Sequence, residues 1–334
     1  MTKVLIPTKI PDSLVQKILG VSSQISVDRR KIEDREWPRD LITDAEIVYA
    51  MNAVPDNSQA PELRWIQLHS AGVNHLIDKP LWDSDVKITT TSGIHAPNMG
   101  QYVMAQILSY ANRVNRWYDY QRQHEWPKGR WNLFLPDELR GRTIGILGYG
   151  SLGREVARLA RGFGMTILAT KHNAKSIVDH GYSIPGTGDP EGMMADRIYP
   201  TEATRLVIIE CDYIVVTLPL TPKTYHLLDE DLLKAMKPNC FLVNVGRGEL
   251  INEAALIRAL ENEWIAGAGL DVFEEEPLPS DSPLWSMSNV LISPHISGFT
   301  PHYDDRAIDV FVENLRRYLN YEPLINLVDR DSGY

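Results

Sequence analysis

Short apolar runs alternate along the chain with segments in which apolar residues recur every three or four positions. In the first hundred residues, the runs at 4–6, 46–50, 65–68 and 88–91 predict strands. Residues 14–19 predict a helix, because their apolar side chains fall on one face. Alternating strands and helices predict a parallel sheet that is covered by helices.

A second strand–helix series follows a long helical pattern over residues 98–124. Its predicted strands lie at 143–147, 166–170, 213–218, 241–245, 266–272 and 290–293. Asn252 is placed to cap one of the intervening helices. Another helical pattern over 303–321 would return the chain to the first series. We therefore predict an α/β protein with two doubly wound parallel-sheet domains.

Length and composition set the class of protein. A chain of 334 residues exceeds what one core usually holds, which favours two domains. The net charge of −10 argues against a nucleic-acid partner or an anionic membrane surface. No apolar run approaches the length of about 20 residues that spans a bilayer, and no leader pattern is seen, so we expect a cytoplasmic protein. Cys211 and Cys240 lie in apolar surroundings and are expected to be buried free thiols.

A glycine signature opens the second series at Gly148-Tyr149-Gly150-Ser151-Leu152-Gly153. It follows a predicted strand and begins an amphipathic helix, which is the context that a dinucleotide-binding turn requires. The glycines allow a tight turn, close approach of a pyrophosphate and close helix packing, and the helix N-terminus attracts phosphate. We predict that residues 101–299 form a dinucleotide-binding Rossmann domain. It would be inserted into a flavodoxin-like domain made of residues 1–100 and 300–334.

The end of the next predicted strand bears on the choice of dinucleotide. An NAD-binding site usually has an acidic residue there, to bind the ribose 2′-hydroxyl. This chain has Thr170-Lys171-His172 instead, and a lysine would attract a 2′-phosphate. We expect NADP(H) to be preferred, with NAD(H) possible, and Thr170 and His172 as additional donors. The long segment 175–204, rich in Gly, Pro and Asp, is expected to be a surface insertion near the adenosine end, with a functional lid as the alternative.

Four polar residues come at the ends of later strands. Arg247, Asp271 with the nearby Glu276, and His295 each follow a different predicted strand. The carboxyl ends of parallel strands meet at one edge of a sheet, where doubly wound proteins bind their ligands. A cation, a carboxylate and an imidazole beside a dinucleotide are the groups that reduction of a 2-keto acid needs.

The combination of motifs resembles the D-2-hydroxyacid dehydrogenase family over nearly the whole chain. The motifs are Ser70-Ala71-Gly72-Val73, Gly93-Ile94-His95-Ala96-Pro97, the glycine signature, Leu218-Pro219-Leu220-Thr221-Pro222-Lys223-Thr224, and the segments at Arg247, Glu276 and His295. The resemblance implies that Arg247 binds the substrate carboxylate and polarises its keto oxygen. It also implies that His295 donates the proton, that Glu276 holds the imidazole in its protonated form, and that Asp271 helps to orient Arg247.

The resemblance implies further contacts and a homodimer formed through the cofactor domain. Backbone N–H groups around Ala71, Gly72 and Val73 would bind the carboxylate of a small 2-keto or 2-hydroxy acid from the first domain. The expected cofactor contacts are Gly148, Gly150, Ser151, Leu152, Gly153, Thr170, Lys171, His172, Pro219, Thr224, Val245, Arg247, Asp271, His295 and Gly298. The aromatic stretch 117–134 would pack against a neighbouring domain or subunit, or would wall the substrate pocket.

Two alternatives use the same fold. Formate dehydrogenases resemble this chain at Arg247 and His295 but carry glutamine in place of the glutamate, so Glu276 argues against them. Corepressor-like proteins that sense a dinucleotide keep the same three residues, so the motif does not exclude them. The Lys171 segment and the lack of a basic or disordered tail favour a metabolic enzyme that reduces a 2-keto acid with NADPH.

Overall fold

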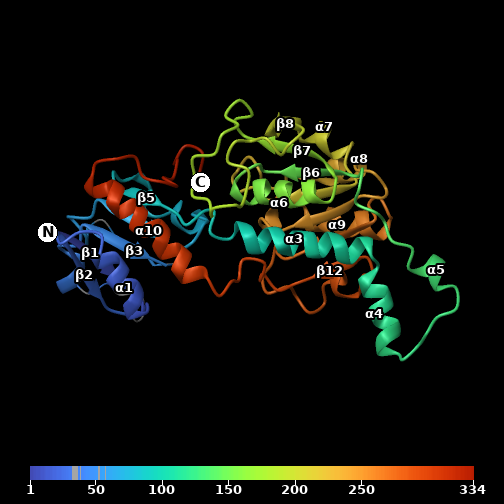
Figure 1. The fold of residues 1–334 in the computed structure, drawn as a ribbon, viewed down its shortest axis with the longest axis horizontal. Helices are drawn as coiled ribbons and strands as arrows, with labels where there is room; N and C mark the ends of the chain where they lie inside the picture. Colours follow the sequence, from blue (N-terminus) through green and yellow to red (C-terminus); the bar gives the residue numbers. More distant parts are fainter. Residues whose placement is uncertain (32–36, 38, 52, 57) are drawn as a thin grey trace. The chain divides into compact units, whose positions relative to one another are not determined.

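The computed structural model describes residues 1–31, 37, 39–51, 53–56 and 58–334 (Figure 1). These residues form two compact units. The first consists of Met1–Ile94, His180–Ile184 and Thr300–Tyr334, and the second of His95–Asp179 and Pro185–Phe299. The first boundary lies at Ile94 rather than at residue 100, and a short piece of the 175–204 segment clusters with the first unit.

The first unit is built on a five-stranded parallel sheet in the order β2-β1-β3-β4-β5. The strands are β1 (Thr2–Ile6), β2 (Ile25–Arg29), β3 (Ile47–Ala50), β4 (Trp65–Leu68) and β5 (Lys87–Thr89). The helices α1 (Asp12–Leu19) and α10 (Tyr303–Leu319) pack on one face, and α2 (Arg39–Ile42) and two 3₁₀ turns pack on the other. The order 2-1-3-4-5 is that of flavodoxin-like folds.

The second unit contains a seven-stranded parallel sheet in the order β12-β11-β10-β9-β6-β7-β8. The strands are β6 (Thr143–Leu147), β7 (Thr166–Lys171), β8 (Arg197–Pro200), β9 (Tyr213–Val216), β10 (Phe241–Asn244), β11 (Gly267–Leu270) and β12 (Val290–Ile292). The order runs outward in both directions from the neighbours β6 and β9, as in Rossmann folds. The predicted fold class is therefore confirmed.

Both faces of this sheet are covered. Side chains of α3 (Ala96–Ala111) and α6 (Ser151–Gly162), which lie side by side in Figure 1, pack on one face. Side chains of α7 (Thr204–Ile208), α8 (Glu230–Ala235) and α9 (Glu253–Glu261) pack on the other. Apolar strands are expected for a sheet that has helices on both sides.

Two sequence predictions are wrong in detail. The helix expected over 98–124 is two helices, α3 and α4 (Val114–Arg122), because Arg113 adopts a left-handed conformation with φ 56° and ends the first helix. The short α5 (Arg130–Leu133) follows in the aromatic stretch. The set of predicted strands was also incomplete, because the 175–204 segment, expected to be a surface insertion, contains the edge strand β8.

Cys211 and Cys240 are buried and free, as expected. Burial raises the pKa of the Cys211 thiol to about 12, so it stays protonated. A search of the described residues finds no helix with the length and apolar character needed to cross a membrane. Over the same residues, no group of three or more His, Cys, Asp or Glu side chains is arranged to hold a metal ion.

Candidate active site

The glycine turn follows β6 directly. Gly148 has φ 107°, a conformation that side-chain-bearing residues rarely adopt. Its N–H donates to the carbonyl oxygen and to the hydroxyl of Thr170, both at 3.2 Å, and the Tyr149 N–H donates to the same carbonyl at 2.7 Å. Thr170 is fully buried, and its hydroxyl oxygen accepts from the turn; its expected contact with the cofactor stays a prediction.

The next two glycines leave room in different ways. A Cβ atom on Gly153 would lie 2.2 Å from the carbonyl oxygen of Gly148, so only glycine lets α6 begin this close to the turn. A Cβ atom on Gly150 would meet nothing within 4 Å, which leaves open space above the turn. The first N–H groups of α6, from Ser151 and Leu152 onward, have no partner within the helix. This cradle fits a dinucleotide pyrophosphate.

Lys171 ends β7, and its side chain is half-buried, while His172 beside it is exposed. Burial lowers the pKa of the Lys171 ammonium, the charge of Arg154 lowers it further, and Asp179 partly offsets both. A partly dehydrated cation at this position is suited to pair with an anion.

A buried arginine of α6 binds the segment that follows β7. Arg154 is 1% exposed and donates to the carbonyl oxygens of Asp189 and Ile177, both at 2.5 Å. Its guanidinium also lies over the ring of Tyr149, whose hydroxyl donates to the Asp189 carboxylate at 2.6 Å. Sequence reasoning missed this cluster, because most of the acceptors are backbone carbonyls in a Gly- and Pro-rich stretch that carries no pattern.

The strand register places the expected catalytic loops at one edge. Asn244, Leu270 and Ile292 are paired across β10, β11 and β12, so the three strands end side by side. The backbone continues this alignment past the strands, because the Asp271 N–H donates to the Asn244 carbonyl at 3.1 Å and the His295 N–H donates to the Asp271 carbonyl at 2.9 Å. The loops that carry Arg247, Glu276 and His295 therefore leave the same end of the sheet.

Arg247 has a fixed backbone and an available side chain. Its carbonyl accepts from the Asn244 amide at 2.9 Å, and the Asn244 carbonyl-type oxygen accepts from the Gly246 N–H at 3.1 Å. The half-buried guanidinium donates to the Gly246 carbonyl at 2.7 Å. Within the described parts of the chain, no carboxylate forms an ion pair with Arg247. The cation is thus positioned to receive an external anion.

His295 and Glu276 form a close pair. The imidazole Nδ1 lies 2.7 Å from Glu276 Oε2, and the other carboxylate oxygen accepts from the Phe273 N–H at 3.1 Å. A carboxylate only accepts, so Nδ1 carries a hydrogen and Nε2 is the nitrogen left for chemistry. The side chains are 50% and 37% exposed, which lets the imidazole exchange protons with water. A proton donor with an oriented imidazole is what this arrangement can supply.

Asp271 has partners that the sequence did not indicate. It is fully buried, and it accepts hydrogen bonds from Ser293 Oγ at 2.5 Å and from the Ile296 and Ser297 N–H groups, both at 2.9 Å. In the part of the chain that the structure describes, no hydrogen bond or ion pair joins it to Arg247. The carboxylate accepts three hydrogen bonds from the segment that carries His295, so Asp271 orients that segment.

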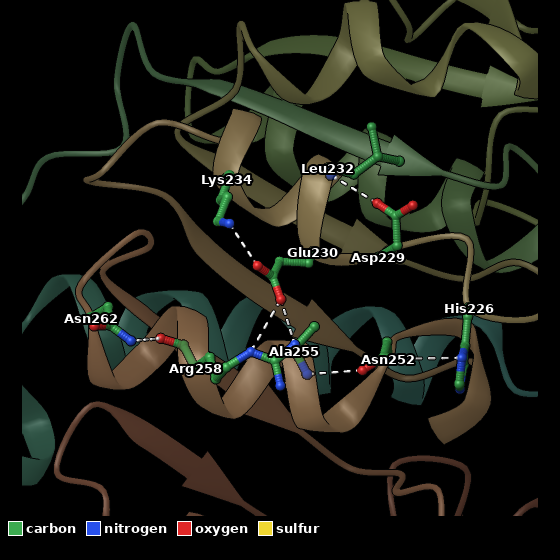
Figure 2. Close-up of polar contacts among 9 residues, drawn as sticks. All are labelled: His226, Asp229, Glu230, Leu232, Lys234, Asn252, Ala255, Arg258 and Asn262. Atoms are coloured by element: carbon green, nitrogen blue, oxygen red, sulfur yellow. Dashed lines mark hydrogen bonds and ion pairs between the residues drawn. The ribbon is translucent and has the colours of Figure 1, made fainter.

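Polar contacts join α8 to α9, the helix that begins shortly after Arg247 (Figure 2). Asn252 caps α9, because its side-chain oxygen accepts from the Ala255 N–H at 2.9 Å, and the predicted cap is confirmed. The Asn252 amide also contacts His226 Nδ1 at 3.3 Å. Glu230 on α8 contacts Arg258 on α9 at 2.5 Å and joins the two helices. The start of α9, shortly after Arg247, is therefore fixed.

The same region secures the segment before Glu276. The Glu253 N–H donates to the Glu274 carboxylate at 3.0 Å, and the Glu274 N–H donates to the Glu253 carboxylate at 3.1 Å. His226 Nε2 lies 2.7 Å from Glu274 Oε1. Burial raises the pKa of the Glu253 carboxyl, and the charges of Glu274 and Glu275 add to this effect. The start of α9 thus follows the loop that carries Arg247 and contacts the segment before Glu276.

The remaining expected contacts lie in ordered loops. Thr224 Oγ1 donates to the Pro219 carbonyl at 2.7 Å, Val245 is buried, and the Gly298 carbonyl lies 3.2 Å from His95 Nδ1. These positions belong to the second unit, whereas the Ala71–Val73 turn belongs to the first and follows β4. In that turn the Ser70 hydroxyl donates to the Gly72 carbonyl at 2.9 Å, Ala71 is exposed and Val73 is buried.

Comparison with known proteins settles the family. The model of the D-isomer specific 2-hydroxyacid dehydrogenase NAD binding domain matches residues 104–297. A glyoxylate reductase of Thermococcus onnurineus is 32% identical, over 98% of this chain and 96% of that protein. This chain belongs to the D-isomer specific 2-hydroxyacid dehydrogenase family. Another relative of this dehydrogenase, a glyoxylate reductase of Korarchaeum cryptofilum, is 34% identical over 81% of this chain and 78% of its own length.

Solved structures agree with this assignment. A D-isomer specific 2-hydroxyacid dehydrogenase family protein from Aeromonas salmonicida superposes with a TM-score of 0.79, at 31% identity over 99% of both chains. A D-isomer specific 2-hydroxyacid dehydrogenase from Xanthobacter autotrophicus, solved with NADPH and MES, gives 0.79 at 27% identity over 100% of this chain and 99% of that one. The D-2-hydroxyacid dehydrogenase described here is thus an NAD(P)-dependent oxidoreductase, a 2-keto acid reductase.

Proposed function

We propose that this dehydrogenase reduces a small 2-keto acid to the D-2-hydroxy acid with NADPH. The observation that carries the proposal is the His295–Glu276 pair at 2.7 Å, at the strand edge that also presents Arg247. Relatives named glyoxylate reductase support glyoxylate and close analogues such as hydroxypyruvate as first candidates, and a bulkier aromatic keto acid is a third. The second unit would be the dinucleotide-binding domain and the first the substrate domain.

The reduced nicotinamide would supply a hydride to the keto carbon, and the protein would supply the rest. Arg247 would pair with the substrate carboxylate through two parallel hydrogen bonds and polarise the keto oxygen, for which a planar guanidinium is suited. His295 would donate its Nε2 proton to that oxygen, so that the product is a neutral hydroxyl and the imidazole is left neutral. Glu276 would accept from Nδ1 and so hold the ring with Nε2 available to the substrate. Solvent would return the proton, since the ring is half exposed.

The Ala71–Val73 turn is proposed to bind the substrate carboxylate through its backbone N–H groups. The Ser70 hydroxyl fixes the turn by its bond to Gly72, and the exposed Ala71 places no large side chain over it. The glycine turn with Ser151 and Leu152 would bind the pyrophosphate, and the loops at Thr224, Val245 and Gly298 would line the rest of the dinucleotide.

NADPH is proposed as the preferred cofactor because Lys171 ends β7 where an acidic residue would select NADH. The exposed His172 is proposed as a second donor, and Thr170 as a third, because its hydroxyl oxygen accepts from the Gly148 N–H and its own hydrogen remains to be donated. The Xanthobacter relative solved with NADPH supports the same choice. A charge-assisted contact to a 2′-phosphate contributes about 1.5–3 kcal/mol, which is about one to two decades of preference.

The test is a turnover assay with a panel of keto acids. The purified protein is incubated with glyoxylate, hydroxypyruvate and phenylpyruvate, each with NADPH or NADH, and loss of the reduced nicotinamide is followed by absorbance. We expect turnover with at least one acid and a lower KM for NADPH than for NADH. Absence of turnover with every pair would contradict the proposal and favour a dinucleotide-sensing binding protein.

We also propose a homodimer that covers the helices α4 and α5. None of the residues in these two helices is buried, and Trp126 and Trp131 are 83% and 75% exposed beside Arg130. Two exposed tryptophans close together in sequence are typical of a protein–protein interface. We expect sedimentation of a dimer, and a shift toward monomer in Trp131→Glu but not in Tyr321→Glu, which alters an exposed ring of the first unit. A wild-type monomer would contradict the proposal.

A further inference from the structure

A tyrosine of α3 reaches the loop that carries His295. The hydroxyl of the half-buried Tyr102 forms a short hydrogen bond with Ser293 Oγ, and Gln106 Nε2 donates to the same hydroxyl at 2.5 Å. Ser293 Oγ in turn contacts the Asp271 carboxylate at 2.5 Å. These four residues form a continuous chain of hydrogen bonds, called here the Tyr102 chain, that runs from α3 to a buried carboxylate.

The direction of every bond in the Tyr102 chain follows from chemistry. The Asp271 carboxylate only accepts, so Ser293 must donate to it. The one Ser293 hydrogen is then used, so Tyr102 must donate to Ser293 and must itself accept from Gln106. Each hydroxyl has one proton to give and gives it toward Asp271. A phenylalanine in place of Tyr102 would leave the Ser293 oxygen without this donor and would leave the Gln106 amide without its acceptor.

The protonation state of Tyr102 is consistent with this role. Burial raises the pKa of its phenol, the charge of Asp271 adds to this effect, and the hydrogen bonds with Ser293 and Gln106 partly offset it. The phenol therefore keeps its proton at neutral pH and remains a donor.

Asp271, the last residue of the Tyr102 chain, holds the backbone beside His295. The Asp271 carboxylate accepts the N–H groups of Ile296 and Ser297, and its carbonyl accepts the N–H of His295. His295 itself has φ 52°, a left-handed conformation that a residue with a side chain adopts only when its surroundings impose it. Successive N–H groups that converge on one anion are the arrangement that imposes it here.

We propose that Tyr102 is a positioning residue, which holds the His295 loop in its left-handed conformation through Ser293 and Asp271. This inference rests on the proposed function only in that its main readout is keto-acid turnover. It assigns a role to the α3 residue that the family motifs leave without one. It also explains why Asp271 is buried with neutral donors around it rather than paired with Arg247.

The experiment compares Tyr102→Phe with Tyr110→Phe, a matched change on the same helix whose ring stacks on Phe241. We expect Tyr102→Phe to lower kcat by about three- to ten-fold, the effect of one hydrogen bond, with KM for NADPH and keto acid within about two-fold. Tyr110→Phe should leave kcat unchanged. A kcat of Tyr102→Phe equal to wild type, with or without a lower Tm, would mean that the tyrosine only packs, and would overturn the inference.

Variants of Ser293 test the path. Ser293→Ala should lower kcat at least as much as Tyr102→Phe, and Ser293→Thr, which keeps the hydroxyl, should restore it. Adding Tyr102→Phe to Ser293→Ala should have no further effect on kcat, because the chain is already broken. Full additivity of the two changes would overturn the proposed path.

Hydrogen exchange separates this inference from the proposed function. We expect the amides of Ile296 and Ser297 to exchange faster in Tyr102→Phe than in wild type or Tyr110→Phe, whatever the substrate is. Unchanged exchange at these amides would overturn the inference even if the enzyme reduces keto acids. If the wild-type protein shows no turnover but Tyr102→Phe still exchanges these amides faster, the proposed function is overturned and the Tyr102 chain remains supported.

Discussion

Charged side chains differ in burial between two sides of the seven-stranded sheet, one beside β7 and the other beside β12. Beside β7, Arg154 and Asp189 are 1% and 3% exposed and bind mostly backbone. Beside β12, His295 and Glu276 are 50% and 37% exposed and bind each other. Groups that only shape a site can be buried where protein partners replace most of their contacts with water, whereas a group that exchanges a proton must keep contact with water.

The contrast extends to the backbone below each group. The side chains proposed to be catalytic lie on loops whose N–H groups donate to Asn244 and Asp271. On the β7 side the order is reversed, because the buried Arg154 holds the backbone of a loop. Mutations should therefore separate into those that remove turnover without loss of stability and those that do the opposite.

Removal of the imidazole should have the largest effect on turnover. His295→Ala should lower kcat by about 10²–10⁴-fold, because the substitution removes the proposed proton donor. Its free energy of unfolding should stay close to wild type, since the side chain is half exposed. His302→Ala, an exposed histidine of the first unit, is the matched control. Turnover of His295→Ala near the wild-type rate would remove the basis for the proposed proton donor.

Neutralising its partner should have the next largest effect. Glu276→Gln keeps an oxygen acceptor near Nδ1 but no longer favours the charged ring, so kcat should fall by about 10–100-fold, within the range of a strong charged hydrogen bond. Glu275→Gln changes an exposed carboxylate one residue away and should have no such effect. Steady-state kinetics of both variants measure the difference, and equal losses would show that general acidity of the segment is what matters.

Lys171 links the two ends, because it lies on the β7 side but would contact the cofactor. Lys171→Ala should raise KM for NADPH by about ten-fold and leave KM for NADH unchanged. The pKa of Lys171 is lowered, chiefly by burial, so its charge is lost earlier than usual as the pH rises. The wild-type NADPH preference should therefore weaken at alkaline pH, and Lys171→Arg should keep it. A preference that does not respond to either substitution would count against Lys171 as the determinant.

The smallest effect on turnover is expected from the buried cluster itself. Tyr149→Phe removes the bond to Asp189, and a bond to a charged group contributes about 1.5–3 kcal/mol to the free energy of unfolding. The value of kcat should stay close to wild type. Urea unfolding monitored by fluorescence measures the loss, and Tyr321→Phe at a 98% exposed position is the control. A Tyr149→Phe protein with wild-type stability would mean that the cluster does not secure the segment.

Much of the fold could be predicted because the helical patterns are long and because alternating strands and helices allow few arrangements of a parallel sheet. The glycine turn and the strand ends of Arg247 and His295 follow from that order alone. The edge strands β2 and β8 were missed because they are short and partly polar, which is what edge strands are. The break at Arg113 was missed because its left-handed turn depends on tertiary packing rather than on a glycine or proline.

The candidate site was predictable in its exposed groups and unpredictable in its buried ones. Arg247, Glu276 and His295 lie in short motifs, and chain order brings them together. Asp271 lies in such a motif too, yet its partners are the backbone of the next loop and Ser293, which no periodicity can indicate. Contacts from backbone groups and from distant helices, such as that of Tyr102, require the coordinates.

Gly248 lies directly against the segment that leads to Glu276. A Cβ atom on it would fall 1.9 Å from the carbonyl carbon of Phe273, so no other residue can follow Arg247 unless both loops move. The loop that carries Arg247 and the loop that carries Glu276 can therefore move only together. Anyone who wishes to redesign the substrate range of this enzyme should leave that junction intact and vary side chains elsewhere.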